Sequence, residues 1–202
     1  MRTRVHPIIV ALAGALAACG GAGARMAPAA GDSPLAASDF SVHDLEARWR
    51  GQDGRERTLA STGGRVRVVA MVYTACTHTC PTIVGEMKRI EAALPAEERG
   101  GVGFLLVSLD PARDTPQRLA NFAGALGLDS AAWTLLTGDE GAVRELAALL
   151  GIRYRAEADA QISHSNTYLV LDAQGRIVHR QEGVGRGTAA TLARIRQAAA
   201  AD

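Results

Sequence analysis

Two cysteines and a histidine lie close together near the middle of the chain, in the segment Cys76-Thr-His78-Thr-Cys80-Pro81. An apolar run at 66–73 precedes them, and a segment with helical periodicity follows Pro81. Unpaired N–H groups and the helix dipole favour anions at the start of a helix, which lowers the pKa of a thiol there. Thiolate is both the nucleophile of disulfide exchange and a soft ligand for copper or zinc. The segment therefore predicts a redox or metal site built on Cys76 and Cys80.

The spacing of the two cysteines suits a shared site. Residues i and i+4 lie on one face of a helix, so both sulfurs point the same way if this turn is helical. Such a pair forms either a disulfide or a two-thiolate metal clamp, and the spacing does not choose between them. A purely structural disulfide is disfavoured, because closing so short a loop removes little chain entropy.

The elements around the cysteines indicate an α/β fold. Strand-like and helix-like segments alternate and are followed by a strand hairpin and a last helix, which predicts a central mixed β-sheet flanked by helices. A reactive cysteine pair after the first core strand indicates a thioredoxin-like fold. The predicted strands are 66–73, 102–109, 133–136, 167–171 and 176–180, the predicted helices are 82–94, 116–126, 140–150 and 188–200, and a turn at 52–54 predicts an N-terminal hairpin.

His164 precedes the predicted strand 167–171. In a thioredoxin-like sheet the loop that enters this strand lies beside the active cysteines, so we expect His164 to supply a third, nitrogen ligand. Two thiolates and one imidazole suit copper, including Cu(I), whereas structural zinc normally has four protein ligands. An open site with three protein ligands suits transfer of the metal to a partner.

Three more polar residues lie in the expected neighbourhood of the site. His78, inside the cysteine loop, is expected to face solvent or to play an auxiliary role. Asp110 and Asp114 follow the strand 102–109, and Asp110 is expected to support the site from outside the ligand set. Asp114 precedes Thr115-Pro116, where turn and capping chemistry is the stronger expectation.

The composition fits one ordinary α/β domain preceded by a tail. The chain has 202 residues, 48% of them apolar, and a formal net charge of +1. The basic residues are almost all arginine, with Lys88 the single lysine, and they are interspersed with acids. We expect no nucleic-acid partner, because such proteins carry clustered basic patches.

Residues 1–19 are predicted to be a lipoprotein signal peptide. Two arginines precede a short apolar run that ends in Leu-Ala-Ala-Cys19. This is the layout of a secretory signal, and the run is too short to span a bilayer. Because Leu-Ala-Ala-Cys resembles the bacterial lipobox, Cys19 is expected to carry lipid. Residues 20–38, rich in Ala, Gly and Pro, then form a flexible tether to a domain at 39–202.

Four segments, in order along the chain, resemble the SCO/SenC family of copper-handling proteins. The resemblance extends from about residue 40 to the C-terminus, and Cys-x-x-x-Cys-Pro with the distant histidine is its most specific part. The segments are Tyr73-Thr-Ala-Cys76-Thr-His-Thr-Cys80-Pro81, Ser108-Leu-Asp110-Pro-Ala-Arg113-Asp114-Thr-Pro116, Trp133-Thr-Leu-Leu-Thr137-Gly138, and His164-Ser165 followed by Tyr168-Leu-Val-Leu-Asp172-Ala-Gln-Gly175.

The resemblance implies a thioredoxin-like protein anchored in the bacterial cell envelope with its domain facing the periplasm. It implies that Cu(I) or Cu(II) is bound by Cys76, Cys80 and His164, and that the two cysteines form a disulfide when oxidised. Family members assist assembly of copper sites in respiratory oxidases, especially cytochrome c oxidase. The expected partner is thus a copper-accepting oxidase subunit or another copper chaperone, with the membrane reached through the lipid anchor. Ser163 stands where the family often has an aspartate before the histidine.

Three other functions use the same cysteines. In a thiol–disulfide oxidoreductase, acting on cysteines of the recipient or of other exported proteins, Cys76 attacks and Cys80 resolves. No proline precedes Thr167, where thioredoxins place a cis-proline, and Ser163-His164 occupies that place instead, which favours a metal site. A thiol peroxidase shares the fold, and a redox signalling module without metal is the third alternative.

Overall fold

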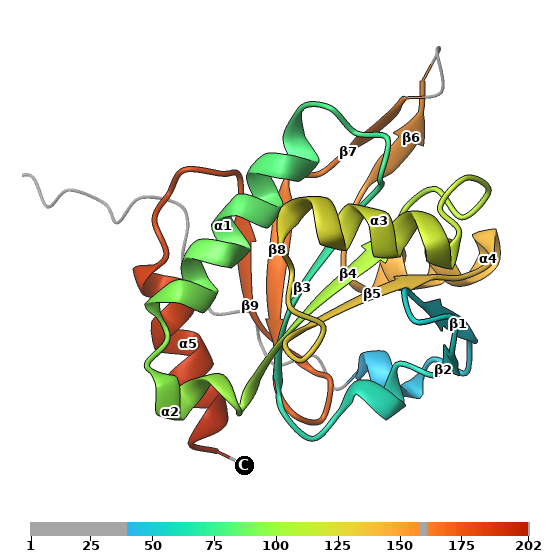
Figure 1. Ribbon diagram of the computed structural model, residues 1–202. Helices are drawn as coiled ribbons and strands as arrows, with labels where there is room; N and C mark the ends of the chain where they lie inside the picture. The colour runs from blue at the N-terminus through green and yellow to red at the C-terminus, as the bar shows by residue number, and fades with distance from the viewer. Residues whose placement is uncertain (1–39, 158–160, 202) are drawn as a thin grey trace, which may run out of the picture. The chain divides into compact units, whose positions relative to one another are not determined.

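The computed structural model describes residues 40–157 and 161–201, which form a mixed β-sheet with helices on both faces (Figure 1). The sheet contains seven strands, β1 (Trp49–Gly51), β2 (Glu56–Arg57), β3 (Val66–Val72), β4 (Val102–Ser108), β5 (Trp133–Thr137), β8 (Thr167–Leu171) and β9 (Ile177–Glu182). A separate hairpin pairs β6 (Tyr154–Ala156) with β7 (Ile162–His164). The helices are α1 (Thr79–Ala93), α2 (Ala96–Arg99), α3 (Pro116–Leu126), α4 (Glu140–Leu149) and α5 (Ala189–Ala199), with 3-10 turns η1 (Val42–Asp44) and η2 (Ala60–Thr62).

The strand order β2-β1-β5-β4-β3-β8-β9 gives the predicted thioredoxin-like arrangement. β3, β4 and β5 run parallel, and the other neighbouring strands are antiparallel. The parallel strands are joined by α1 and α3, because a parallel pair needs a crossover connection. The α/β class and the mixed sheet are therefore confirmed.

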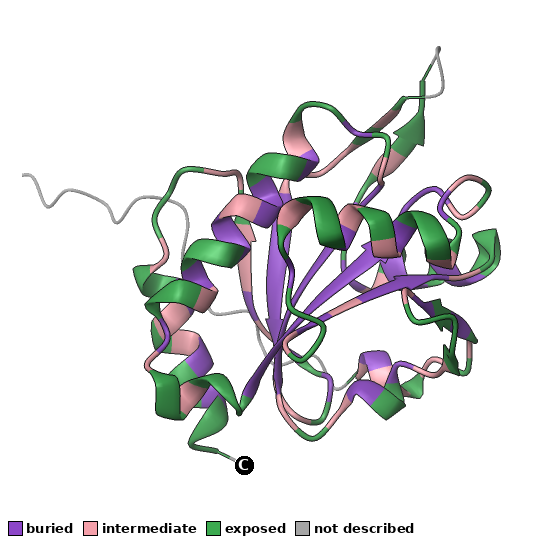
Figure 2. Ribbon diagram, viewed as in Figure 1, coloured by how far each residue is buried: buried purple, intermediate pink, exposed green. Residues whose placement is uncertain are grey.

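β3 is the central strand and is buried along its whole length (Figure 2). It pairs with β4 on one side and β8 on the other, so every one of its residues contacts a neighbouring strand or a helix layer. Its valine-rich sequence fits a strand covered on both faces. The residues that follow β3 are consequently positioned by the most buried part of the molecule.

Alternate residues of β3 point into two separate cores. Val68 belongs to a cluster with Met87 of α1, and this cluster also includes residues of α3 and α5. Val69 belongs to a cluster with Leu146 of α4 and with the N-terminal segment. α1 therefore lies against one face of the sheet with α3 and α5, while α4 covers the other face.

Most predicted elements are present at or near their predicted positions. Thr115 caps α3 by accepting a hydrogen bond from the backbone N–H of Arg118 at 3.3 Å, and Pro116 is the first helical residue, as expected. The turn at 52–54 joins β1 to β2 in the predicted hairpin. The hairpin of β8 and β9 is also confirmed.

Three features of local structure differ from the predictions. α1 begins at Thr79 rather than after Pro81, so Pro81 lies in the first helical turn. A proline is tolerated there because the N–H groups of the first turn have no partner within the helix. The hairpin of β6 and β7 and the short helix α2 were not predicted, since segments of three or four residues are too short to show periodicity.

The predicted signal peptide at 1–19, Cys19 and the tether at 20–38 lie outside the described residues. Within the part of the chain that the structure describes, no helix is both long enough and apolar enough to cross a membrane.

Candidate metal centre

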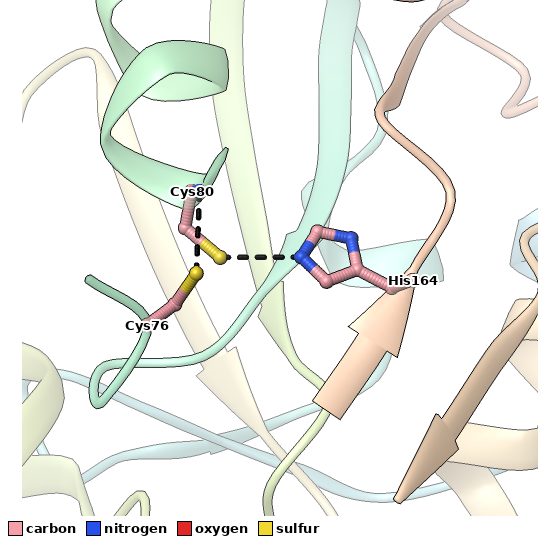
Figure 3. A group of neighbouring side chains, drawn as sticks. All are labelled: Cys76, Cys80 and His164. Atoms are coloured by element: carbon pink, nitrogen blue, oxygen red, sulfur yellow. Dashed lines mark hydrogen bonds between the residues drawn. The ribbon is translucent and has the colours of Figure 1, made fainter. Parts of the chain in front are cut away.

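Two consecutive segments of the chain and one distant segment meet at one end of the sheet. Cys76 lies in the turn that follows β3, Cys80 lies in the first turn of α1, and His164 is the last residue of β7 (Figure 3). One ligand atom from each, two Sγ and one imidazole nitrogen, all lie within 4.8 Å of one another. The structure thus brings together the three residues that were predicted from the sequence to be metal ligands.

Hydrogen bonds orient the imidazole toward the sulfurs. Nδ1 of His164 lies 3.0 Å from the carbonyl oxygen of Ser165, an acceptor, so the ring proton is assigned to Nδ1. Nε2 is then left with its lone pair and lies 3.3 Å from Sγ of Cys80. This is the ring orientation that a histidine needs to coordinate a metal through Nε2.

The two thiols differ in their environments. Burial alone would raise the pKa of Cys76, but hydrogen bonds outweigh it and lower this pKa to about 6. They come from the side chain and backbone N–H of Cys80, the backbone N–H of His78 and the hydroxyl of Thr79. At Cys80, burial and then the neighbouring Cys76 raise the pKa far above its usual value. Cys76 keeps 8% of its surface exposed and Cys80 keeps none, so Cys76 is the more reactive thiolate.

Both cysteines are free thiols in this structure. Two thiolates and an imidazole, gathered at a partly buried place, match the donors that copper prefers. With three protein ligands the group leaves a coordination position for a further ligand.

Asp114 holds the cysteine loop from inside the protein. Its carboxylate is completely buried and accepts hydrogen bonds from the backbone N–H of Thr74 at 3.1 Å, from the Thr74 hydroxyl at 2.5 Å and from the Ser108 hydroxyl at 2.6 Å. It therefore joins the end of β4 to the turn between β3 and Cys76. Asp110, the carboxylate expected to support the site, instead forms an ion pair with Arg113.

From the sequence, turn or capping chemistry was the stronger expectation for Asp114, because this residue directly precedes a capping threonine. The side chain of Thr115 performs the capping, which leaves the carboxylate of Asp114 for the loop. A signal was present in two hydroxyl residues, Ser108 at the end of β4 and Thr74 just after the end of the adjacent parallel strand β3. Such ends meet at one edge of a sheet, and a buried carboxylate needs donors of this kind.

Tyr73 supports the histidine side of the site, a role that the sequence did not indicate. Its hydroxyl accepts a hydrogen bond from the backbone N–H of Ile162 at 3.2 Å and donates one to the side chain of Gln161 at 3.0 Å. Its ring lies edge-on to the His164 imidazole, with 6.1 Å between the ring centroids. The last core residue before the cysteine loop thus contacts both ends of β7.

His78 does not join the ligand group. It is exposed, it occupies the N-cap position of α1 without a capping hydrogen bond from its side chain, and its Nδ1 lies 2.8 Å from the hydroxyl of Thr77. Only its backbone N–H reaches the site, as a donor toward Cys76.

A model of the SCO1/SenC family matches residues 43–200. The chain belongs to this family. A protein of Stutzerimonas stutzeri named "Putative copper-binding protein" is 34% identical over 118 residues, which is 56% of each of the two chains. The "SCO1 protein homolog" of Bacillus subtilis is 27% identical over 139 residues, 67% of this chain and 72% of that protein.

Solved structures of the SCO1/SenC family share the fold. BsSco, described as a member of the Sco family of cytochrome c oxidase assembly proteins, superposes with a TM-score of 0.70 at 25% identity, over 84% of this chain and 98% of its own. A SCO1/SenC family lipoprotein of Bacillus anthracis gives 0.68 at 24% identity, covering 82% and 95%. Copper-bound ScoI of Bradyrhizobium japonicum gives 0.60 at 20% identity, covering 75% and 96%. The last two likenesses concern the fold.

Proposed function

We propose that this SCO1/SenC protein binds copper through Cys76, Cys80 and His164 and delivers it to a copper site of a respiratory oxidase. The observation that carries the proposal is the convergence of two sulfurs and one Nε2 within 4.8 Å. Family membership, a relative named as copper-binding and the oxidase-assembly role given for BsSco all support it.

The residues divide the work of binding and release. His164 directs Nε2 toward the sulfurs, because Nδ1 is held by the carbonyl oxygen of Ser165. Cys76 is ready as thiolate at neutral pH, whereas the Cys80 thiol has to give up its proton when the metal arrives. Because Cys76 is the more exposed sulfur, a ligand of the recipient replaces Cys76 first in the exchange of the metal. The buried Cys80 dissociates from the metal last.

We further propose that the protein is held in the bacterial envelope by lipid on Cys19, with the domain in the periplasm. The signal-like segment at 1–19 and the lipobox-like Leu-Ala-Ala-Cys19 support this proposal. The B. anthracis structure that shares the fold belongs to a protein described as a SCO1/SenC family lipoprotein. The copper-accepting partner is an oxidase subunit or another copper chaperone in the same compartment.

The contrast between the two thiols favours thiol–disulfide exchange as a second function. The Cys76 thiolate attacks one sulfur of a partner's disulfide, forming a mixed disulfide and releasing one partner thiolate. The Cys80 thiol then loses its proton and attacks the Cys76 sulfur, which closes the Cys76–Cys80 disulfide and releases the second partner thiol. The partner gains two electrons and this chain loses two.

An anaerobic Cu(I) titration of the reduced protein tests the copper proposal. We expect one tight site in the wild type and no tight site in Cys76→Ser/Cys80→Ser. In His164→Ala we expect the copper affinity to be weakened roughly tenfold or more. His78→Ala is the matched control, because it removes an exposed imidazole of the same loop and is expected to bind like the wild type.

Affinity that does not change in His164→Ala would contradict the three-ligand site. Two results together would leave disulfide exchange as the function. His164→Ala would reduce a model disulfide at the wild-type rate, and no variant would have a tight copper site.

A further inference from the structure

An open cavity of about 580 Å³ lies at the end of the sheet opposite the cysteines. Its walls include residues just before β3, β4 and β5, whereas Cys76 comes just after β3. Because these three strands are parallel, their beginnings share one edge of the sheet and their ends share the other. The charged residues of its lining are Arg65, Lys88, Glu91, Arg99 and Asp129.

The three cations of the lining are held by backbone carbonyls rather than by acids. Lys88 donates to the carbonyl of Leu126 at 2.6 Å, Arg65 to that of Ala131 at 3.3 Å and Arg99 to that of Leu94 at 3.0 Å. Among residues 40–157 and 161–201, the ion pairs found involve none of these three cations. Each of the three is therefore oriented by a carbonyl group and forms no ion pair with a carboxylate among these residues.

The two acids of the lining each accept a hydrogen bond from a neighbouring group of the cavity wall. Glu91 accepts a hydrogen bond from the indole N–H of Trp133 at 2.9 Å, and Asp129 accepts one from the backbone N–H of Ala131 at 3.0 Å. Each holds a wall of the cavity in place. The charged groups that line the cavity therefore leave an excess of positive charge.

Arg65, at the edge of the cavity, also lies close to Arg67, which is not part of the lining. Nε of Arg65 is 2.9 Å from the position that a Cβ on Gly103 would occupy, and Nη1 of Arg67 lies closer still, so both guanidinium groups cover this glycine. Arg67 is buried, and its Nη1 has no hydrogen-bond partner. Burial, with the charge of Arg65, lowers the pKa of Arg67 to about 10. Two guanidinium groups packed together without an acid repel each other, and a bound anion would offset that repulsion.

The described domain also begins at this end of the sheet. Ser41 forms a β-bridge with Arg176 and donates its hydroxyl to the carbonyl of Gln174, in the turn between β8 and β9. That turn follows Leu171, which pairs with Arg67 near the start of β3. The chain that leads to Cys19 therefore joins the domain on the side of the cations, away from the metal centre.

We propose that this cavity binds a phosphate oxyanion, and that in the anchored protein the phosphate is the phosphodiester of a lipid headgroup. Arginine and lysine are the side chains best suited to phosphate oxygens, and basic residues near a membrane surface attract its phosphates. The lipid assignment rests on the proposed anchor at Cys19, whereas the oxyanion site does not. Headgroup binding would turn the metal centre away from the bilayer, toward a partner in the periplasm.

The first test is calorimetric titration of the full chain with inorganic phosphate and with sn-glycero-3-phosphoglycerol, a soluble headgroup analogue, at constant ionic strength. We expect one site, weakened about tenfold by Lys88→Gln or Arg65→Gln, because each removes one charge-assisted hydrogen bond. Arg118→Gln is the matched control, because it removes an exposed arginine on α3 that does not line the cavity. The absence of binding, or equal weakening by Arg118→Gln, would overturn the proposal.

The second test distinguishes a lipid from free phosphate. The lipidated full chain is reconstituted in phosphatidylglycerol–phosphatidylcholine vesicles that carry a nitroxide on the headgroup. We expect the nitroxide to quench tryptophan fluorescence, since the indole of Trp133 is hydrogen-bonded to Glu91 in the cavity wall. We expect Lys88→Gln to relieve this quenching and Arg118→Gln to leave it unchanged.

Flotation with the vesicles reports the anchor separately. A chain that floats and binds soluble phosphate but shows no quenching overturns the lipid assignment and leaves a site for free phosphate. A chain that does not float contradicts the anchor and with it the lipid assignment, while the calorimetric result on the oxyanion site still stands.

Discussion

The two halves of the metal centre are held in different ways. The cysteine loop follows the fully buried strand β3 and is fixed by Asp114, whose carboxylate has no exposed surface. His164 ends a two-stranded hairpin outside the main sheet, whose residues are half-buried or exposed. Local opening is easiest where few buried contacts would be lost. The hairpin, which carries the imidazole, is therefore the half of the centre that opens more easily, while the core keeps both sulfurs in place. This difference suits the proposed capture and release of copper.

Removing the buried carboxylate should have the largest effect. Asp114→Ala leaves the Thr74 and Ser108 donors unpaired inside the protein, so we expect the free energy of unfolding to fall by about 3 kcal/mol. Urea unfolding measures this loss. Asp110→Ala is the control, because it removes a carboxylate of the same loop whose partner Arg113 is partly exposed, and it should cost clearly less. Equal losses would mean that Asp114 does not specifically fix the cysteine loop.

The thiols should differ strongly in alkylation. With a pKa of about 6, Cys76 is mostly thiolate at pH 7, and its rate should fall about tenfold for each pH unit below 6 because the thiolate is the reacting form. Cys80, buried and with a raised pKa, should remain unmodified across this range. Mass spectrometry after timed iodoacetamide treatment of the reduced protein follows both sites. A midpoint of Cys76 near 8.5, the usual value, would remove the contrast between the thiols.

A smaller and local effect is expected from Tyr73→Phe. The variant loses the hydroxyl that bonds Ile162 and Gln161, at a cost of about 1 kcal/mol, so amide exchange of Ile162 should quicken about fivefold. Hydrogen exchange monitored by NMR checks this. Tyr168→Phe, which removes a hydroxyl facing Thr191 in the core, should leave the exchange of β7 unchanged. If both variants quicken exchange of β7 equally, the hairpin is not held through Tyr73.

Elements with a long, repeated pattern were predictable. The apolar runs of β3, β4 and β8 and the Thr115-Pro116 start of α3 were identified because burial and capping leave their signature in neighbouring residues. The hairpin that carries His164 was missed, since its strands are three residues long and are held by the hydroxyl of Tyr73, far away in the sequence. The start of α1 was misplaced because a proline in the first turn reads equally well as a boundary.

The sequence by itself determined the class of chemistry: a close pair of thiols at the beginning of a helix, a distant histidine before a core strand, and the order of elements that makes a thioredoxin-like sheet. Only the tertiary structure decided that Nε2 of His164 faces Cys80, that Asp114 rather than Asp110 supports the loop, and that Cys76 is the acidic thiol. The reason is physical. Residue types and their spacing can be read directly from the sequence. The burial of a group and the hydrogen-bond donors that reach it depend on how distant segments pack.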